Sequence, residues 1–288
     1  MKRVRVLAII VCTVLLAVFM LSTSYAGQKC EAAYGEGPVK FSLATGSPGE
    51  LGLLKVITEA FCEGKNISMC WVKAGSGASL KLLQNKAVDI AMVHAPAAEK
   101  KAIADGWAIK RTLIGSNEFY IVGPADDPAH IAAAKTAPDA YARIVKARSK
   151  FFSRGDNSGT HKKELFIWKE AGIVPSGDWY IVTKDFMRAT LIRADKEKGY
   201  FMTDSSTWVS DKKNVPNLKI LFRGDKVLIN TYHALCQPEG ATPGASIAAE
   251  FVDFVASEVG QSLIGNYGKK EYGEGLYNDA AYARQYED

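Results

Sequence analysis

The sequence has few residues of the kinds that hold metal ions. Its four histidines stand singly among 288 residues, and none of the usual short Cys or His spacings of zinc sites occurs. The Gly-x-Ser-x-Gly elbow of serine hydrolases is also missing. No internal repeat or low-complexity run is visible. We therefore expect no metal site, no cofactor and no enzymatic activity.

Strong positive charge is missing as well, once the first 26 residues are set aside. They read as a signal peptide, with a basic start, an apolar stretch over residues 7–21 and a small-x-small pattern that ends at Ala26. We expect cleavage there and export to the periplasm. The net charge of +5 then falls by three, to +2, because Lys2, Arg3 and Arg5 are removed. No large basic surface remains to predict binding to nucleic acid.

Four cysteines follow the signal segment, at positions 30, 62, 70 and 236. Pairing is the default in an oxidising compartment, and three connectivities are possible. We favour a bond between Cys62 and Cys70, because the turn at residues 64–66 would fold a helix end back against the next strand.

Short apolar runs alternate with amphipathic stretches along the rest of the chain, which predicts an α/β fold with a largely parallel sheet. The expected strands are 39–44, 67–72, 89–93, 119–122, 179–182, 199–203 and 218–222, and residues 151–152 read as the end of a further short strand. The expected helices are 51–61, 78–85, 97–105, 129–134, 137–147, 161–171, 188–195 and 246–267.

Two breaks in this alternation predict a division into two lobes. A Gly- and Pro-rich stretch at residues 123–128 suits a first crossing between them, and the apolar run at residues 228–236 suits a second. Lobe I would comprise residues 27–124 and 230–288, and lobe II residues 125–229. A ligand cleft between such lobes could close by a hinge motion.

Three loops that open helices carry hydroxyl groups and glycines, and they are the candidate binding loops. Residues 44–49, 74–79 and 153–160 each follow an expected strand, where ligands of α/β sheets bind. The third loop adds Arg154 and places Ser158 as an N-cap. Each loop alone could be an ordinary capped turn. Together they favour a site for an oxyanion, held by N–H groups, hydroxyls and one guanidinium.

The third loop and its surroundings resemble the signature of the periplasmic tungstate-binding proteins of ABC importers. The matching stretch runs from Ser153 to Glu164 and continues through Trp168 and Lys169 to Ile173. Val93-His94, the segment 121–128 and Ala189-Thr190-Leu191 extend the likeness over nearly the whole exported chain.

This resemblance implies a two-lobe type II periplasmic binding protein that passes tungstate or molybdate to a membrane permease. The protein would be a monomer. Asp156 would support Arg154 or its loop, and His94 is interpreted as a structural side chain. The residues that the loops and the resemblance nominate for the ligand are Thr45, Ser47, Ser76, Ser153, Arg154, Ser158, Thr160, Arg188 and Thr190.

Departures from the family pattern keep a second ligand class open. The first loop has only two hydroxyls, and Phe186-Met187-Arg188 stands where the family has Gly-Met-Gly. Phosphate or a small organic acid is therefore the alternative ligand on the same fold. A secreted enzyme is a third possibility, suggested only by Ser158 and His161. Residues of these types at a helix start more often form a cap than a catalytic pair.

Overall fold

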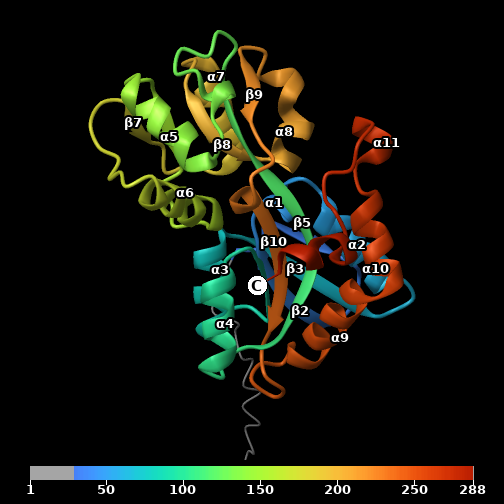
Figure 1. The fold of residues 1–288 in the computed structure, drawn as a ribbon. Helices are drawn as coiled ribbons and strands as arrows, with labels where there is room; N and C mark the ends of the chain where they lie inside the picture. Colours follow the sequence, from blue (N-terminus) through green and yellow to red (C-terminus); the bar gives the residue numbers. More distant parts are fainter. Residues whose placement is uncertain (1–28, 288) are drawn as a thin grey trace, which may run out of the picture.

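The computed structural model describes residues 29–287, so the expected signal peptide, residues 1–26, lies outside the described part. A ten-stranded sheet has the order β1-β3-β2-β4-β10-β5-β8-β6-β7, and β9 pairs with β5. Helices cover the sheet in two groups that lie one above the other (Figure 1). Among the described residues, no helix is long and apolar enough to cross a membrane.

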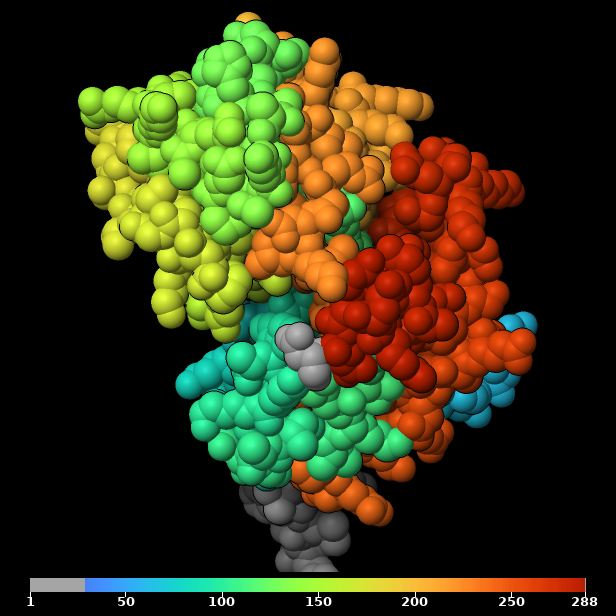
Figure 2. Space-filling model, in the orientation of Figure 1, coloured from blue at the N-terminus to red at the C-terminus, as the bar shows by residue number. Residues whose placement is uncertain are grey.

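One long strand, β5 (Ile109–Pro124), belongs to both groups. As far as Glu118 it pairs with β10 (Ile229–Cys236), and from Phe119 it pairs with β8 (Tyr200–Asp204). We call residues 29–118 with 229–287 the larger half, and residues 119–228 the smaller half. The chain therefore passes between the halves through two adjacent antiparallel strands. The space-filling view shows the halves in contact across a narrower middle (Figure 2).

The larger half packs helices on both faces of its strands. Phe41 and Leu43 of β2 (Val39–Thr45) belong to one core with α2 (Leu53–Cys62), whereas Ala44 faces a second, smaller cluster. This division follows from the two-residue period of a strand. Its other elements are α1 (Ser47–Glu50), β1 (Ala32–Tyr34), β3 (Ile67–Lys73), α3 (Ser76–Gln84), β4 (Ile90–Val93), α4 (Pro96–Ala104), α9 (Ala245–Ala256), α10 (Glu258–Asn266), α11 (Lys269–Tyr272), α12 (Ala280–Ala283) and η4 (Arg284–Tyr286).

The smaller half is built around buried aromatic rings. Tyr141 of α5 (Ala137–Lys146) and Trp168 of α6 (Gly159–Glu170) lie with ring centroids 4.2 Å apart, and Phe151 of β6 (Phe151–Ser153) packs on both. Such contacts fix the position of α6 relative to the sheet. The remaining elements are η1 (Ile131–Ala133), β7 (Tyr180–Val182), α7 (Met187–Lys196), α8 (Ser205–Asp211), η2 (Lys212–Asn214), β9 (Leu218–Phe222) and η3 (Lys226–Leu228).

The predicted α/β class and most predicted elements are confirmed, with three exceptions. The sheet is mixed rather than largely parallel, since β5 and β10 run antiparallel to their neighbours. Residues 129–134 form only a short 3-10 turn. The predicted helix 246–267 is two helices, because Ser257 adopts an extended backbone and its hydroxyl caps α10 by accepting from the N–H of Gly260.

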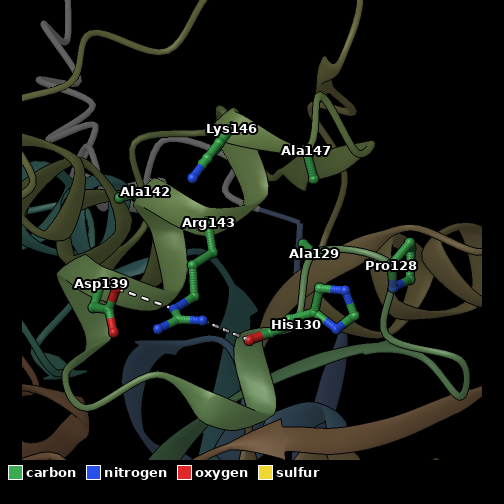
Figure 3. Close-up of a pocket in the computed structure, with 8 residues that line it drawn as sticks. All are labelled: Pro128, Ala129, His130, Asp139, Ala142, Arg143, Lys146 and Ala147. Atoms are coloured by element: carbon green, nitrogen blue, oxygen red, sulfur yellow. Dashed lines mark hydrogen bonds and ion pairs between the residues drawn. The ribbon is translucent and has the colours of Figure 1, made fainter.

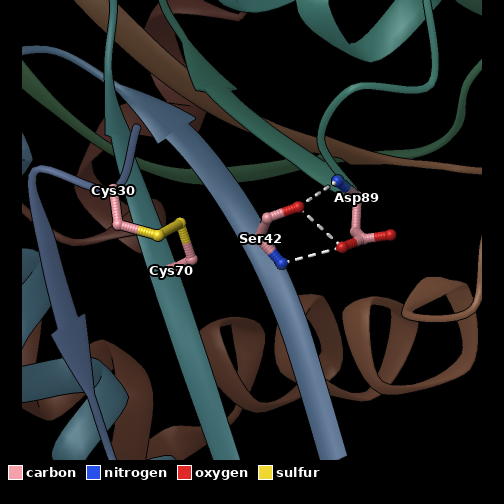
Figure 4. Close-up of a disulfide and its surroundings, with 4 residues drawn as sticks. All are labelled: Cys30, Ser42, Cys70 and Asp89. Atoms are coloured by element: carbon pink, nitrogen blue, oxygen red, sulfur yellow. Dashed lines mark hydrogen bonds between the residues drawn. A yellow bond between two sulfur atoms is a disulfide. The ribbon is translucent and has the colours of Figure 1, made fainter. Parts of the chain in front are cut away.

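The predicted Cys62–Cys70 disulfide is wrong, because Cys70 is bonded to Cys30 (Figure 4). The short strand β1 pairs antiparallel with β3, which brings the two Cα atoms to 5.4 Å. Cys62 faces the core that contains Met69 and Trp71, whereas Cys70, between them in β3, points to the opposite face. Cys62 and Cys236 are buried free thiols.

Candidate functional site

A small enclosed cavity lies where the two halves meet. The ends of β2, β3 and β4 approach it from the larger half, and the loop between β6 and α6 approaches it from the smaller half. About 10 Å³ is open to the centre of a water-sized sphere, roughly the minimum for one water. The lining residues are Thr45, Gly46, Ser47, Pro48, Gly75, Ser76, Met92, His94, Arg154, Ser158, Phe186 and Tyr232.

Two serine hydroxyls, one from each half, are oriented by backbone N–H groups. The Oγ atom of Ser76 accepts from the N–H of His94 at 3.2 Å, and that of Ser158 accepts from the N–H of His161 at 3.2 Å. The second bond confirms Ser158 as the N-cap of α6. A hydroxyl that accepts a bond keeps its own proton. Both serines can therefore donate to a ligand in the cavity.

Arg154 is the buried cation of the site, with 4% of its surface exposed. Its Nε and Nη2 atoms donate to Oδ2 of Asp156 at 3.1 and 2.5 Å. Burial raises the pKa of Asp156, but the charge of Arg154 and hydrogen bonds from Ser158 outweigh it and lower the pKa below its usual value. Asp156 therefore stays ionised and holds the guanidinium in place. Within residues 29–287 no hydrogen bond from Nη1 is found, so this nitrogen remains for a ligand.

The first loop contributes Thr45 and Ser47. The hydroxyl of Thr45 donates to the carbonyl of Met92 at 2.9 Å, which fixes the end of β2 to β4. The hydroxyl of Ser47 lies 3.4 Å from Oδ2 of Asp204, a residue of the smaller half. This long hydrogen bond crosses between the halves beside the cavity.

His94 lines the cavity, and its Nδ1 atom is buried without a hydrogen-bond partner among the described residues. Its ring packs against Tyr232, with centroids 4.9 Å apart. Burial, followed by the charges of Arg154 and Lys163, lowers the pKa of His94 to about 3. The imidazole is therefore neutral at physiological pH.

Four of the nominated residues do not line the cavity. Ser153 and Thr160 are buried beside it, and the hydroxyl of Thr190 pairs with that of Thr183 at 2.9 Å. The Arg188 side chain is 60% exposed and pairs with Asp211 at 2.9 Å.

Phe186 and Tyr232 line the cavity but were not nominated from the sequence. Tyr232 comes from β10, more than 70 residues after the third loop, so no local pattern could place it there.

Two buried acidic side chains, Glu99 and Glu164, accept hydrogen bonds from residues near the binding loops. Glu99 is fully buried, and its Oε1 atom accepts from the N–H of Ala95 at 2.6 Å, beside His94. Glu164 accepts from the hydroxyl of Tyr180 at 2.7 Å and from the indole N–H of Trp168 at 3.1 Å. Burial raises the pKa of Glu164 to about 7, although these hydrogen bonds oppose the shift.

A larger hollow, which none of these loops lines, lies beside α5 (Figure 3). It is wide open to solvent, and its guanidinium is already engaged. Arg143 pairs with Asp139 at 3.1 Å and donates to the carbonyl of His130 at 3.2 Å. The enclosed cavity between the halves is therefore the better candidate for a ligand site.

The chain resembles known proteins along most of its length. A model described as a PBP superfamily domain matches residues 32–259. The chain is 34% identical over 286 residues to the tungstate-binding protein TupA of Peptoclostridium acidaminophilum, covering 93% of this chain and 98% of that protein. The structure resembles the tungstate ABC transporter structure from Geobacter sulfurreducens, with a TM-score of 0.72 and 35% identity, covering 81% of this chain and 100% of that one. It also resembles TupA from Desulfovibrio alaskensis G20, with a TM-score of 0.69 and 35% identity, covering 83% and 98%.

Proposed function

Because the chain belongs to the PBP superfamily and to the family of the tungstate-binding proteins, we propose that it is a periplasmic solute-binding protein of an ABC transporter. Its ligand would be a tetrahedral oxyanion, tungstate or molybdate, which it would deliver to a membrane permease. The signal peptide expected in residues 1–26 supports this location, and we propose that the exported chain is a monomer.

The observation that carries the proposal is a cavity whose lining offers hydrogen-bond donors and no carboxylate. Tungstate and molybdate are fully deprotonated at neutral pH, so they accept hydrogen bonds and donate none. Ser76, Ser158 and Arg154 are oriented to donate, and bonds that involve a charged group contribute about 1.5–3 kcal/mol each. The small cavity also favours a compact inorganic anion over an organic acid.

We propose that five of the nominated residues contact the anion directly: Ser76, Arg154 and Ser158 as the donors already oriented, and Thr45 and Ser47 once their hydroxyls turn to the anion from Met92 and Asp204. Ser153, Thr160 and Thr190 would position the loops, and Arg188 would act at the rim through Asp211. Phosphate, which carries a proton at neutral pH, needs an acceptor in the cavity. The carboxylate of Asp156 is directed to Arg154 instead, which supports the fully deprotonated anions.

Binding would close two lobes over the anion. We propose that these correspond to residues 27–124 with 230–288 and to residues 125–229, with the end of β5 built into the second core. Asn117 and Asn230 lie where the two crossing strands pair, and the amide of Asn230 donates to that of Asn117 at 2.8 Å. This pair of strands is the natural place for a hinge.

Thermal unfolding of residues 27–288 with a panel of anions tests the proposal. A ligand at a thousand times its dissociation constant stabilises the folded chain by about 4 kcal/mol, a shift of several degrees. We expect tungstate and molybdate to raise the melting temperature, and sulfate and phosphate to leave it unchanged. Stabilisation by phosphate or by an organic acid alone would contradict the proposal.

A further inference from the structure

We infer that Phe186 is a lid on the anion site, held shut by Lys73 from the opposite half, and that this contact slows release of the anion. The inference rests on the proposed function and adds to it a residue that controls how long the ligand stays bound. Phe186 is the N-cap residue of α7 in the smaller half, whereas Lys73 is the last residue of β3 in the larger half.

The ring of Phe186 lines the cavity and is half-buried. Two cations lie over it: the Nζ atom of Lys73 at 4.4 Å from the ring centroid, and the guanidinium carbon of Arg154 at 5.5 Å. Both distances lie within the range of cation–π attraction. The ring therefore lies near both the buried cation of the site and a cation of the other half of the molecule.

Lys73 is fixed in this position by an ion pair. Its Nζ atom lies 2.7 Å from Oε1 of Glu50, a residue of α1, next to the first binding loop. The contact between Lys73 and Phe186 joins the two halves, so it can exist only while they are closed. It therefore stabilises the closed form and leaves the open form unchanged.

A contact made only after closure has a kinetic signature. Encounter of the anion with the open site does not involve the lid, so the association rate stays the same. Opening must break the contact between ring and ammonium, so the dissociation rate rises when either partner is removed. For a ring that is half-buried, a cation–π contact with one ammonium corresponds to about a fivefold change in this rate.

The test is stopped-flow measurement of tungstate binding and release, followed by the chain's tryptophan fluorescence. We expect Phe186→Gly to release tungstate at least tenfold faster than the parent, with an association rate within threefold. Lys73→Met should accelerate release severalfold in the parent, and should add nothing in a Phe186→Leu background, where the aromatic face is gone. Phe166→Ala is the matched control, because Phe166 is an exposed ring on α6 of the same half.

The possible outcomes distinguish failure of the lid proposal from failure of the proposed function. A parent chain that does not bind tungstate overturns the proposed function. A parent that binds, together with a Phe186→Gly variant that releases tungstate within twofold of the parent rate, overturns the lid alone. Equal acceleration by Lys73→Met in both backgrounds overturns the pairing of Lys73 with Phe186.

Discussion

The imidazole of His94 lies directly against the backbone of Gly159, so that a Cβ atom at Gly159 would fall 2.3 Å from Cε1 and 2.4 Å from Nδ1 of the ring. His94 follows a strand of the larger half, and Gly159 is the first residue of α6 in the smaller half. Real Cβ atoms do not approach other atoms so closely. The close contact of the halves beside the anion site thus depends on a glycine.

Substitution of this glycine should weaken binding without unfolding the protein. In Gly159→Ala the added methyl group would push the halves apart at the site, so we expect at least about a tenfold loss of tungstate affinity by titration calorimetry, or ~1.4 kcal/mol. Gly265→Ala is the control, because Gly265 lies within α10 and its Cβ would meet only ordinary contacts, 3.6 Å from Cβ of Asp279. Equal affinity of the two variants would show that closure does not need this contact.

Removal of the buried guanidinium should have the largest effect on affinity. Arg154→Ala deletes at least one charge-assisted donor and leaves Asp156 as an unpaired negative charge beside the anion. We expect at least about a 100-fold rise in the dissociation constant, since each such bond contributes ~1.5–3 kcal/mol.

Arg143→Ala is the matched control for this variant, since Arg143 pairs with Asp139 in the same half but lies on the surface. Calorimetric titration with tungstate should give the parent affinity for this control. An Arg154→Ala variant with a dissociation constant within threefold of the parent would remove Arg154 from the site.

Stability should depend on pH through Glu164. Its pKa is about 7 in the folded chain, above the ordinary value of 4.5, so the folded chain holds the proton more tightly than the unfolded chain. The stabilisation that the protonated carboxyl gives is complete below about pH 4.5 and is lost as the pH rises through about 7. The whole change amounts to about 3 kcal/mol.

Glu164→Gln keeps the shape of the protonated acid and cannot titrate. Urea unfolding of parent and variant between pH 4 and pH 8 should show the parent losing stability relative to the variant as the pH rises. A constant difference between the two chains across this range would mean that Glu164 does not titrate there.

The disulfide should stabilise the fold without contributing to the site. Cys30 and Cys70 are 40 residues apart, and closing a loop of this length in the unfolded chain gives about 2–4 kcal/mol. We expect Cys30→Ser to lower the free energy of unfolding by this amount and to leave tungstate affinity unchanged. Cys236→Ser should keep the disulfide and is the comparison for the tungstate affinity of a chain that lacks one sulfur atom elsewhere. A lowered affinity in Cys30→Ser alone would link the bond to the site.

Local patterns predicted most of the elements and the loops that meet at the cavity. Ser76, Ser158 and Arg154 could be nominated because each lies in a polar loop that opens a helix. Local patterns did not predict the disulfide partner of Cys70. The pairing of β1 with β3 decides that partner, and β1 is too short to be recognised as a strand from the sequence. Arg188 is a second case, since its pairing with Asp211 depends on how α7 and α8 pack. Phe186 and Tyr232 enter the site through contacts that only the folded chain brings together.

The most direct test of the account is a crystal structure of residues 27–288 grown with tungstate, with data collected at a tungsten absorption edge. Tungsten scatters anomalously, so its position is found without reference to the protein. We predict one strong peak in the cavity between the halves, with oxygen atoms within hydrogen-bond distance of Ser76, Ser158 and Arg154. A peak elsewhere, or no peak in crystals grown with excess tungstate, would contradict the assignment of this cavity as the anion site.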